Sequence, residues 1–138
     1  MTPQGERARV LVVDDEKVIA QLIADMLSGE GYDVDTAPDG VVALARLAER
    51  RYDVVLSDLR MPELDGLGLF REIEARHPEV LRRFMFITGT SEHTDYHGFI
   101  DEVRVPVLTK PFDMMELFRL VQELSGAQPV ATAAPSGA

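Results

Sequence analysis

The chain has 138 residues, no cysteine and a formal net charge of -10 at pH 7, which fits one domain without disulfides, thiolate metal sites or a cysteine nucleophile. Its hydrophobic fraction of 46% is typical of a folded globular protein and argues against disorder. Acidic residues outnumber basic ones, 24 to 14, which argues against direct binding to nucleic acid because neutralising phosphates requires a basic surface.

Strand-like and helix-like apolar patterns alternate along residues 9–124. In chain order, the expected elements are a strand at 10–13, a helix at 18–27, a strand at 32–36, a helix at 41–48, a strand at 54–56, a helix at 67–73, a strand at 84–87, a weaker helix at 94–103, a strand at 105–108 and a helix at 114–124. Four of the strands are continuously apolar, as in a parallel sheet covered on both faces, whereas 32–36 alternates and suits an edge. The order predicts an α/β fold, a doubly wound (βα)5 sheet in three layers.

The two ends of the chain lack these patterns. We expect residues 1–8 to be a flexible N-terminus and residues 125–138, SGAQPVATAAPSGA, to be a disordered tail or linker, since the latter is uncharged and rich in Pro, Ala, Gly and Ser. The folded domain is then 9–124. No apolar stretch has the length of a membrane span, and the start, MTPQGERARV, lacks the layout of a secretion signal. We therefore expect a cytoplasmic protein without membrane contact.

Polar side chains follow four of the expected strands. They are Asp14 and Asp15 after the first strand, Asp58 after the third, Thr88 after the fourth and Lys110 after the fifth. The carboxyl ends of parallel strands meet at one edge of the sheet, where α/β proteins bind ligands. Three carboxylates there repel one another unless a cation joins them, and oxygen ligands without His or Cys favour a hard ion such as Mg2+ or Mn2+.

Lys110 indicates that an anion shares this site. The chain has 12 Arg but only 2 Lys, so a lysine here suggests a compact point charge for a phosphate-like group. Three carboxylates, one divalent cation and Lys110 sum to zero charge, which would allow the site to accept a phosphoryl group. A carboxylate can act as the nucleophile and form an aspartyl phosphate. This chemistry leaves open which aspartate attacks.

Four motifs resemble the receiver domain of two-component response regulators. They are VLVVDDE (10–16), VVLSDLRMPELDG (54–66), FITGT (86–90) and VLTKPF (107–112), in the family's order and spacing. The stretches LRRFMFITGT (81–90) and VPVLTKPF (105–112) also look like receivers attached to hybrid sensor kinases. The resemblance implies a flavodoxin-like sheet with strand order 2-1-3-4-5. It also implies a signalling switch that accepts a phosphoryl group from a histidine kinase or histidine phosphotransfer protein, and that catalyses only its own phosphorylation and dephosphorylation.

The resemblance also implies roles for individual residues. Asp58 matches the phosphoacceptor, Asp14 and Asp15 match the acidic pair, and Asp15 and Asp58 match direct metal ligands. The metal-binding set is completed by the backbone carbonyl of Arg60. Thr88 matches the hydroxyl that moves to the phosphoryl oxygen, Lys110 matches the family's lysine, and Lys110–Pro111 matches its cis peptide. The resemblance also implies a monomer, or a weak homodimer that pairs through the face of the fourth helix.

Two positions set this chain apart from the common family pattern or bear on its regulation. Val107 stands where the family usually carries Tyr or Phe, so the usual rotation of an aromatic ring on activation cannot occur there. This favours a receiver that relays phosphate or signals through another surface. We also expect Arg60 to overhang the site and slow hydrolysis of the phosphoryl group.

Val18, Gln21 and Leu22 follow the acidic pair, where family receivers contact kinase helices.

Other interpretations of these residues remain open. The departure at Val107 leaves room for a receiver-like interaction scaffold that works without phosphorylation. A Mg2+-dependent phosphatase would need Asp-x-Asp after the first strand, and a flavin binder would place its phosphate against the carboxylates. His93 and His97 have the spacing of a zinc pair but lack further ligands. Gly66-Leu-Gly68 is not a dinucleotide fingerprint, and the chain has no ATP-binding P-loop motif.

Overall fold

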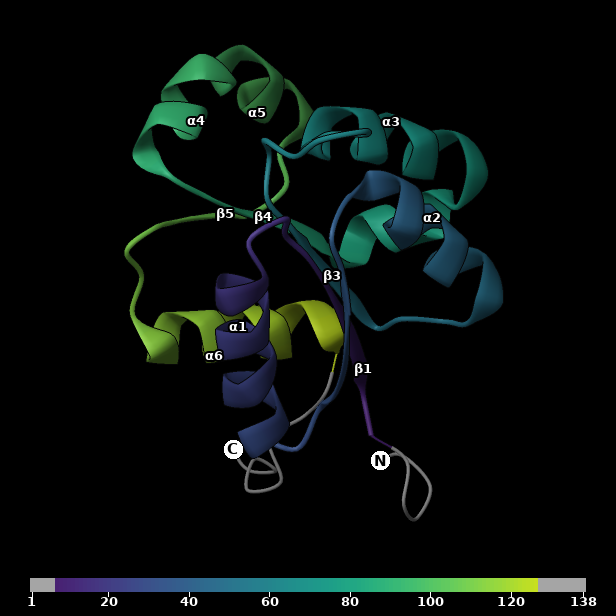
Figure 1. Ribbon diagram of the computed structural model, residues 1–138, viewed down its shortest axis with the longest axis vertical. Helices are drawn as coiled ribbons and strands as arrows, with labels where there is room; N and C mark the ends of the chain where they lie inside the picture. Colours follow the sequence, from purple (N-terminus) through teal and green to yellow (C-terminus); the bar gives the residue numbers. More distant parts are fainter. Residues whose placement is uncertain (1–6, 127–138) are drawn as a thin grey trace.

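The computed structural model describes residues 7–126, except the side chains of residues 90 and 92, as a parallel sheet with helices on both faces (Figure 1). The strands are β1 (Arg9–Val13), β2 (Asp33–Ala37), β3 (Val54–Ser57), β4 (Phe84–Thr88) and β5 (Val107–Thr109). The helices are α1 (Lys17–Gly29), α2 (Gly40–Glu49), α3 (Gly66–Arg76), α4 (Thr90–Asp95), α5 (His97–Val103), α6 (Met114–Ser125) and a 3-10 helix, η1 (Pro78–Arg83).

The five strands are all parallel and lie in the order β2-β1-β3-β4-β5. The predicted fold class and strand order are therefore confirmed, and the alternating strand does lie at an edge. Because β1 and β3 are neighbours in the sheet but not in the sequence, chain segments separated by tens of residues end side by side. The carboxyl ends of β1, β3, β4 and β5 form one edge of the sheet.

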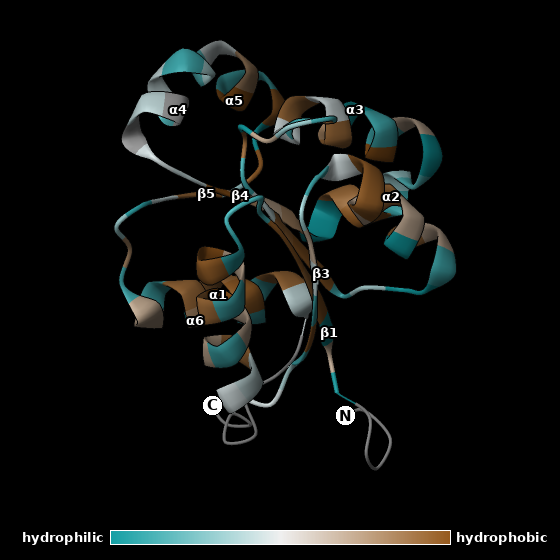
Figure 2. Cartoon of the chain, viewed as in Figure 1, coloured by the Kyte–Doolittle hydropathy of each residue, from teal (hydrophilic) through white to brown (hydrophobic). Residues whose placement is uncertain are grey.

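Two hydrophobic layers cover the sheet, one on each face. Side chains alternate between faces along a strand, so Leu11 and Val13 join one buried cluster while Val10 and Val12 join the other. Helices α1 and α6 pack on the face of Val10 and Val12, whereas α2, α3 and α5 pack on the opposite face (Figure 1). The inner strands are mostly brown, whereas the helices carry both brown and teal residues (Figure 2).

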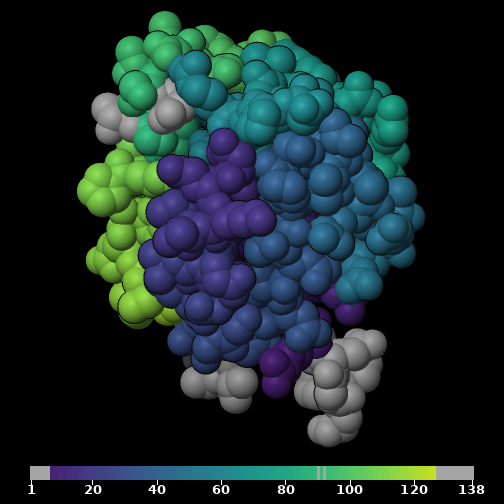
Figure 3. Space-filling model, in the orientation of Figure 1, coloured from purple at the N-terminus to yellow at the C-terminus, as the bar shows by residue number. Residues whose placement is uncertain are grey.

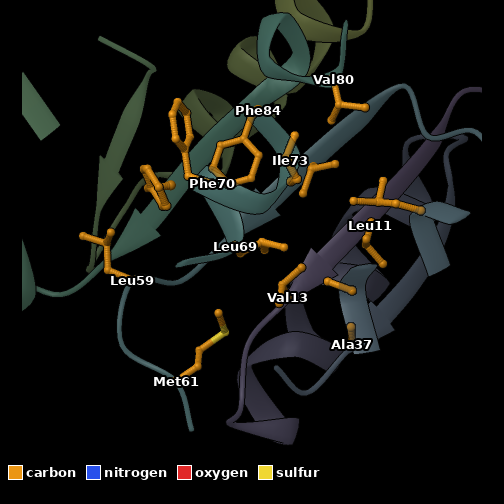
Figure 4. Close-up of a cluster of buried hydrophobic side chains, with 14 of the residues drawn as sticks. Leu11, Val13, Ala37, Leu59, Met61, Leu69, Phe70, Ile73, Val80 and Phe84 are labelled. Atoms are coloured by element: carbon orange, nitrogen blue, oxygen red, sulfur yellow. The ribbon is translucent and has the colours of Figure 1, made fainter. Parts of the chain in front are cut away.

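Four phenylalanines form the centre of the layer under α3 and α5. Phe70 and Phe84 lie side by side in the core (Figure 4), and their ring centroids are 5.6 Å apart with an interplanar angle of 84°. Phe86 lies 4.9 Å from Phe84, and Phe99 of α5 lies 5.6 Å from Phe70. Edge-to-face contacts of this kind add to the burial of apolar area. They join α3 and α5 to β4.

The segment predicted as one weak helix over 94–103 is instead two short helices, α4 and α5, separated at Tyr96. The ring of Tyr96 packs against the core, and its hydroxyl donates a hydrogen bond to Asp65 Oδ2 over 3.2 Å. These tertiary contacts bend the chain at a point where the local pattern gives no stop signal. The 3-10 helix η1 was not expected from the sequence; it begins at Pro78, a residue suited to the first turn of a helix.

The boundaries of the folded region differ slightly from the expected 9–124. Helix α6 continues to Ser125 and ends at Gly126, whose φ of +73° is the left-handed conformation typical of a helix C-terminus. The Ala8 carbonyl accepts a hydrogen bond from the Asp33 amide at 3.0 Å. The other residues of the expected flexible segments, 1–6 and 127–138, lie outside the described residues. Within 7–126, no helix is both long and apolar enough to span a membrane.

Candidate functional site

The backbone at the carboxyl ends of the strands holds the predicted site residues in place. The sheet's hydrogen bonding continues one residue past the strands: the Asp58 amide donates to the Val13 carbonyl at 2.9 Å, and the Lys110 amide donates to the Thr88 carbonyl at 2.8 Å. The Asp14 amide likewise donates to the Ala37 carbonyl at 3.0 Å. The direction of each side chain at this edge is therefore fixed by the sheet.

Three carboxylates meet at this edge. Asp14, Asp15 and Asp58 each offer an oxygen atom within 4.8 Å of the others, and they are the one group of three potential metal ligands among the described residues. Asp14 and Asp58 are buried, with 4% and 8% of their surface exposed, while Asp15 is exposed. Lys110 Nζ lies 3.5 Å from both Asp14 Oδ2 and Asp58 Oδ2. One ammonium thus faces three carboxylates, which leaves an excess of negative charge.

The pKa values reflect this imbalance. Burial raises the pKa of Asp58 to about 6; the Lys110 ammonium opposes the rise, and the Asp14 carboxylate adds to it. Burial would lower the pKa of Lys110, but the Asp58 and Asp14 carboxylates outweigh it and raise that pKa. Without a further cation, the ionised form of Asp58 is therefore costly. The donor set of carboxylate oxygens fits a hard divalent cation such as Mg2+.

Thr88 supplies a hydroxyl that has no partner. Its side chain is 0% exposed, and Oγ1 is one of two buried side-chain polar atoms without a hydrogen bond in the described part of the chain. A buried hydroxyl without a partner is unfavourable, and such groups concentrate where a ligand completes the hydrogen bond. Since the Lys110 amide bonds to the Thr88 carbonyl, this hydroxyl and the Lys110 ammonium occupy neighbouring strand ends.

The loop between β3 and α3 depends on a glycine. The Gly66 amide donates to the Leu59 carbonyl at 2.8 Å, so the loop folds back on itself directly after Asp58. A Cβ atom at Gly66 would overlap the Asp58 carbonyl oxygen and would lie 2.8 Å from Leu59 Cα. Asp65 then begins α3 by accepting a hydrogen bond from the Gly68 amide at 2.8 Å. The position of Asp58 thus requires the absence of a side chain at residue 66.

Arg60 lies at the rim of the site. It lines a cleft of about 470 Å3 together with Asp58. Its guanidinium forms an ion pair with Asp95 of α4, and Cζ lies 5.7 Å from the centre of the Tyr96 ring. Asp95 and Tyr96 are 35 and 36 positions away, and no sequence signal linked them to Arg60. This contact joins the loop after Asp58 to the helices that follow β4.

The remaining predicted residues are placed as follows. The Lys110–Pro111 peptide is cis, as the resemblance implies. Val107 is half-buried, pairs with Phe86 across the sheet and packs against the phenylalanine layer. His93 and His97 lie on two different helices and belong to no group of three metal ligands among the described residues. The zinc hypothesis is therefore not supported.

Apolar side chains on α1 are exposed close to the site. Val18 is 79% exposed and Leu22 is 53% exposed, although α1 buries its opposite side. The space-filling view shows α1 on the surface between α6 and α2 (Figure 3). Met114 and Met115, at the start of α6, are 46% and 69% exposed.

The fold and the site define a doubly wound α/β protein with a cluster of carboxylates, a threonine and a lysine beyond its strand ends. Residues 10–122 match the family model of the response regulator receiver domain, and the chain belongs to this family. The family assignment favours this class over a phosphatase or a flavin binder.

Relatives of known name are longer than this chain. The chain is 34% identical over 119 residues to the sensor kinase CckA of Brucella abortus, covering 85% of this chain and 12% of the relative. It is 36% identical over 117 residues to the DNA-binding transcriptional regulator NtrC of Salmonella typhimurium, covering 85% of this chain and 24% of the relative. The chain thus spans less than a quarter of the length of either relative.

Solved structures of receiver domains superpose over nearly their whole length. One is the receiver domain of the sensor histidine kinase PA1611 from Pseudomonas aeruginosa, whose structure has magnesium coordinated in the active-site cleft. It is 32% identical to this chain with a TM-score of 0.78, and the superposition covers 88% of this chain and 100% of that chain. The receiver domain of NtrX from Brucella abortus has 32% identity and a TM-score of 0.77, covering 86% and 99%.

Proposed function

We propose that this chain is a phosphoacceptor of two-component signal transduction, with Asp58 as the residue that is phosphorylated. The observation that carries this proposal is the buried Asp58 carboxylate beside Lys110, with two further carboxylates within 4.8 Å. Asp58 Oδ2 faces the lysine, whereas Oδ1 accepts a hydrogen bond from the Leu59 amide at 2.8 Å. The backbone thus orients the carboxylate.

The donor is a phosphohistidine on a histidine kinase or histidine phosphotransfer protein. An Asp58 oxygen attacks phosphorus, a phosphorus–oxygen bond forms, and the phosphorus–nitrogen bond to the imidazole breaks. The Lys110 ammonium stabilises the negative charge that stays on the phosphoryl oxygens. The Thr88 hydroxyl, which lacks a partner, donates a hydrogen bond to one of these oxygens. In water, hydrolysis of the acyl phosphate restores Asp58, so the protein catalyses only its own modification and its reversal.

Mg2+, or Mn2+ in its place, would be held by Asp14, Asp15, Asp58 and the backbone carbonyl of Arg60. When bound, the ion supplies positive charge that neutralises the carboxylates and the phosphoryl oxygens. A receiver of 32% identity whose cleft holds magnesium supports this choice of ion. The excess of negative charge in the site supports it independently.

Arg60 regulates the lifetime of the phosphoryl group in this proposal. Its side chain lines the cleft beside Asp58 and is held at the rim by Asp95 and Tyr96. From there it restricts the approach of water to the phosphorylated aspartate. The same contact gives the loop after Asp58 a physical link to α4, which the valine at position 107 cannot supply through an aromatic ring.

The exposed apolar residues of α1 form the surface for the phosphoryl donor. Val18 and Leu22 lie on the first helix after the acidic pair, and Gln21 lies between them with its amide bonded to Asp25 at 2.8 Å. An apolar patch at the entrance to the site suits a partner helix that carries the phosphohistidine. We further propose a cytoplasmic protein that is a monomer or weak homodimer and does not itself contact DNA or membrane.

Phosphorylation can be tested with a small donor. The protein is incubated with Mg2+ and acetyl phosphate, and intact-mass spectrometry measures the addition of one phosphoryl group. We expect an acid-stable, base-labile addition that is absent in Asp58→Asn and retained in Asp101→Asn, a control on the exposed side of α5. If Asp58→Asn is modified as fully as the parent, the acceptor is another residue. If the parent is never modified, a scaffold that works without phosphorylation becomes the better explanation.

A further inference from the structure

A second cavity lies at the edge of the sheet opposite to Asp58. Its walls come from the end of α2, the loop that leads into β3, and η1, which leads into β4. Since β3 and β4 are parallel, their amino ends lie at the opposite edge from Asp58 and Thr88. The cavity measures about 570 Å3, within the range of small-molecule sites. It is lined by Leu47, Ala48, Glu49, Arg50, Arg51, Tyr52, His77, Glu79, Val80, Arg82 and Arg83.

The lining is positively charged although the whole chain is acidic. Four of the 12 arginines lie around this cavity, against two glutamates. Arg50 and Arg51 are exposed and pair with carboxylates outside the lining, Asp35 at 3.4 Å and Asp53 at 3.7 Å. Within residues 7–126, Arg82 and Arg83 have no carboxylate at ion-pair distance. Two arginines thus line the cavity without an ion-pair partner among the described residues.

Arg83 carries a donor that the protein leaves unused. Its Nε is buried without a hydrogen-bond partner, and the other such side-chain atom in the described region is Thr88 Oγ1 in the phosphorylation site. Burial lowers the pKa of the Arg83 guanidinium, and the Arg51 and Arg82 charges lower it further, whereas the Asp53 and Glu79 carboxylates only partly oppose the shift. A buried, unpaired donor that carries a full charge is costly unless a ligand accepts its hydrogen bond. An anion in the cavity would accept this hydrogen bond and would also offset the repulsion between Arg83 and Arg51.

We propose that this cavity binds a small organic phosphate. Arg82 and Arg83 hold the phosphate, since the planar fork of a guanidinium matches two phosphate oxygens. The apolar side chains of Leu47 and Val80 contact the uncharged part of the ligand. A nucleic acid or an acidic protein is disfavoured because the chain as a whole carries a charge of -10 and would repel a long polyanion. The site is separate from Asp58, so it does not depend on the function proposed above.

Binding is tested by NMR on the 138-residue protein with backbone amides labelled with 15N. The buffer contains a chelator and no Mg2+, so that the Asp58 site does not attract phosphate. The probes are inorganic phosphate, glucose 6-phosphate and AMP. We expect saturable shifts of amides around the cavity, and at least about fivefold tighter binding of one organic probe than of inorganic phosphate. The tighter organic probe identifies a nucleotide or a sugar phosphate as the ligand class; equal affinity for all three would overturn the proposal.

Matched variants locate the site. Arg83→Gln should weaken binding about tenfold or more, as expected for the loss of a charge-assisted hydrogen bond. Arg76→Gln removes an exposed arginine that pairs with Glu72 outside the cavity, and it should change affinity less than about twofold. Arg82→Gln tests the same site at an exposed position, in case Arg83→Gln does not fold. Asp58→Asn should bind the probes as the parent does.

Two further results would overturn the proposal. One is the absence of saturable shifts at the cavity with every probe. The other is an equal loss of affinity in Arg82→Gln, Arg83→Gln and Arg76→Gln, which would indicate attraction by general surface charge. Failure of phosphorylation at Asp58 would leave this proposal unaffected, because the two measurements use different residues and different conditions.

Discussion

Replacing Asp58 by Asn should stabilise the metal-free protein at neutral and alkaline pH. The pKa of Asp58 rises from 3.8 to about 6 on folding, mainly because of burial. At 1.36 kcal/mol per unit, this shift corresponds to about 3 kcal/mol, and access of water through the open cleft reduces it to about 1–2 kcal/mol. Asn keeps the shape and an oxygen that can accept the Leu59 hydrogen bond, but it carries no charge. The charge, not the packing, is therefore what the substitution removes.

The sign of the pH dependence follows from the direction of the shift. The folded state binds the proton on Asp58 more tightly than the unfolded state, so stability falls as the pH rises from about 4 to 6 and stays reduced above that range. The advantage of Asp58→Asn should therefore be complete at pH 8 and absent near pH 3.5. For a domain of this size, 1–2 kcal/mol corresponds to an increase of about 4–8 °C in Tm.

Thermal and urea unfolding at pH 3.5, 6 and 8, with a chelator present, measure this effect. Asp101→Asn, on the exposed surface of α5, is the control and should change stability by less than about 0.5 kcal/mol. Mg2+ should stabilise the parent more than it stabilises the Asp58→Asn variant. Adding Mg2+ should therefore narrow the difference in Tm between the two proteins. A destabilising charge on Asp58 is ruled out if Asp58→Asn is no more stable than the parent at pH 8, or if its advantage is the same at pH 3.5.

Three further substitutions probe the site. Gly66→Ala should destabilise the protein by about 1–3 kcal/mol, because the added Cβ overlaps the Asp58 backbone. The control, Gly98→Ala, has open space around it in α5 and should be neutral or stabilising. Equal urea midpoints for the two variants would contradict the close packing at Gly66. Thr88→Val should raise the free energy of unfolding by up to about 1 kcal/mol, because it removes a buried hydroxyl without a partner. The same substitution should slow phosphorylation by acetyl phosphate. A destabilised variant would mean that the hydroxyl has a partner. Arg60→Gln should shorten the lifetime of phosphorylated Asp58 about threefold or more. Mass spectrometry after removal of the phosphodonor measures this lifetime. An unchanged lifetime would rule out a role for Arg60 at the rim.

Much of the fold follows from local patterns in the sequence. Strands such as 10–13 and 84–87 are continuously apolar, and a chain segment that is apolar on both sides is stable only between two layers of helices. The alternating segment 32–36 has one polar side, which is acceptable only at an edge. These patterns depend on burial alone, and for that reason the five strands, the edge position of 32–36 and the layers of helices agree with expectation. The strand order was implied by the family resemblance and not by these patterns.

The site residues were also visible in the sequence, because each one follows a strand. Parallel strands place their carboxyl ends at one edge, so Asp14, Asp58, Thr88 and Lys110 had to converge. Their burial and spacing were not visible. The rise of the Asp58 pKa comes mainly from burial, and it is opposed by Lys110, a residue 52 positions away.

Two features were decided only by the tertiary structure. The contact of Arg60 with Asp95 and Tyr96 joins residues more than 30 positions apart, and it lies where a segment that looks like one helix is divided into two. The basic cavity beside Arg83 combines short, unremarkable pieces of α2, a loop and η1. The sequence determined which segments are buried because burial depends on a residue's own side chain. Only the folded structure determined these two sites, because each depends on which distant side chains the sheet brings together.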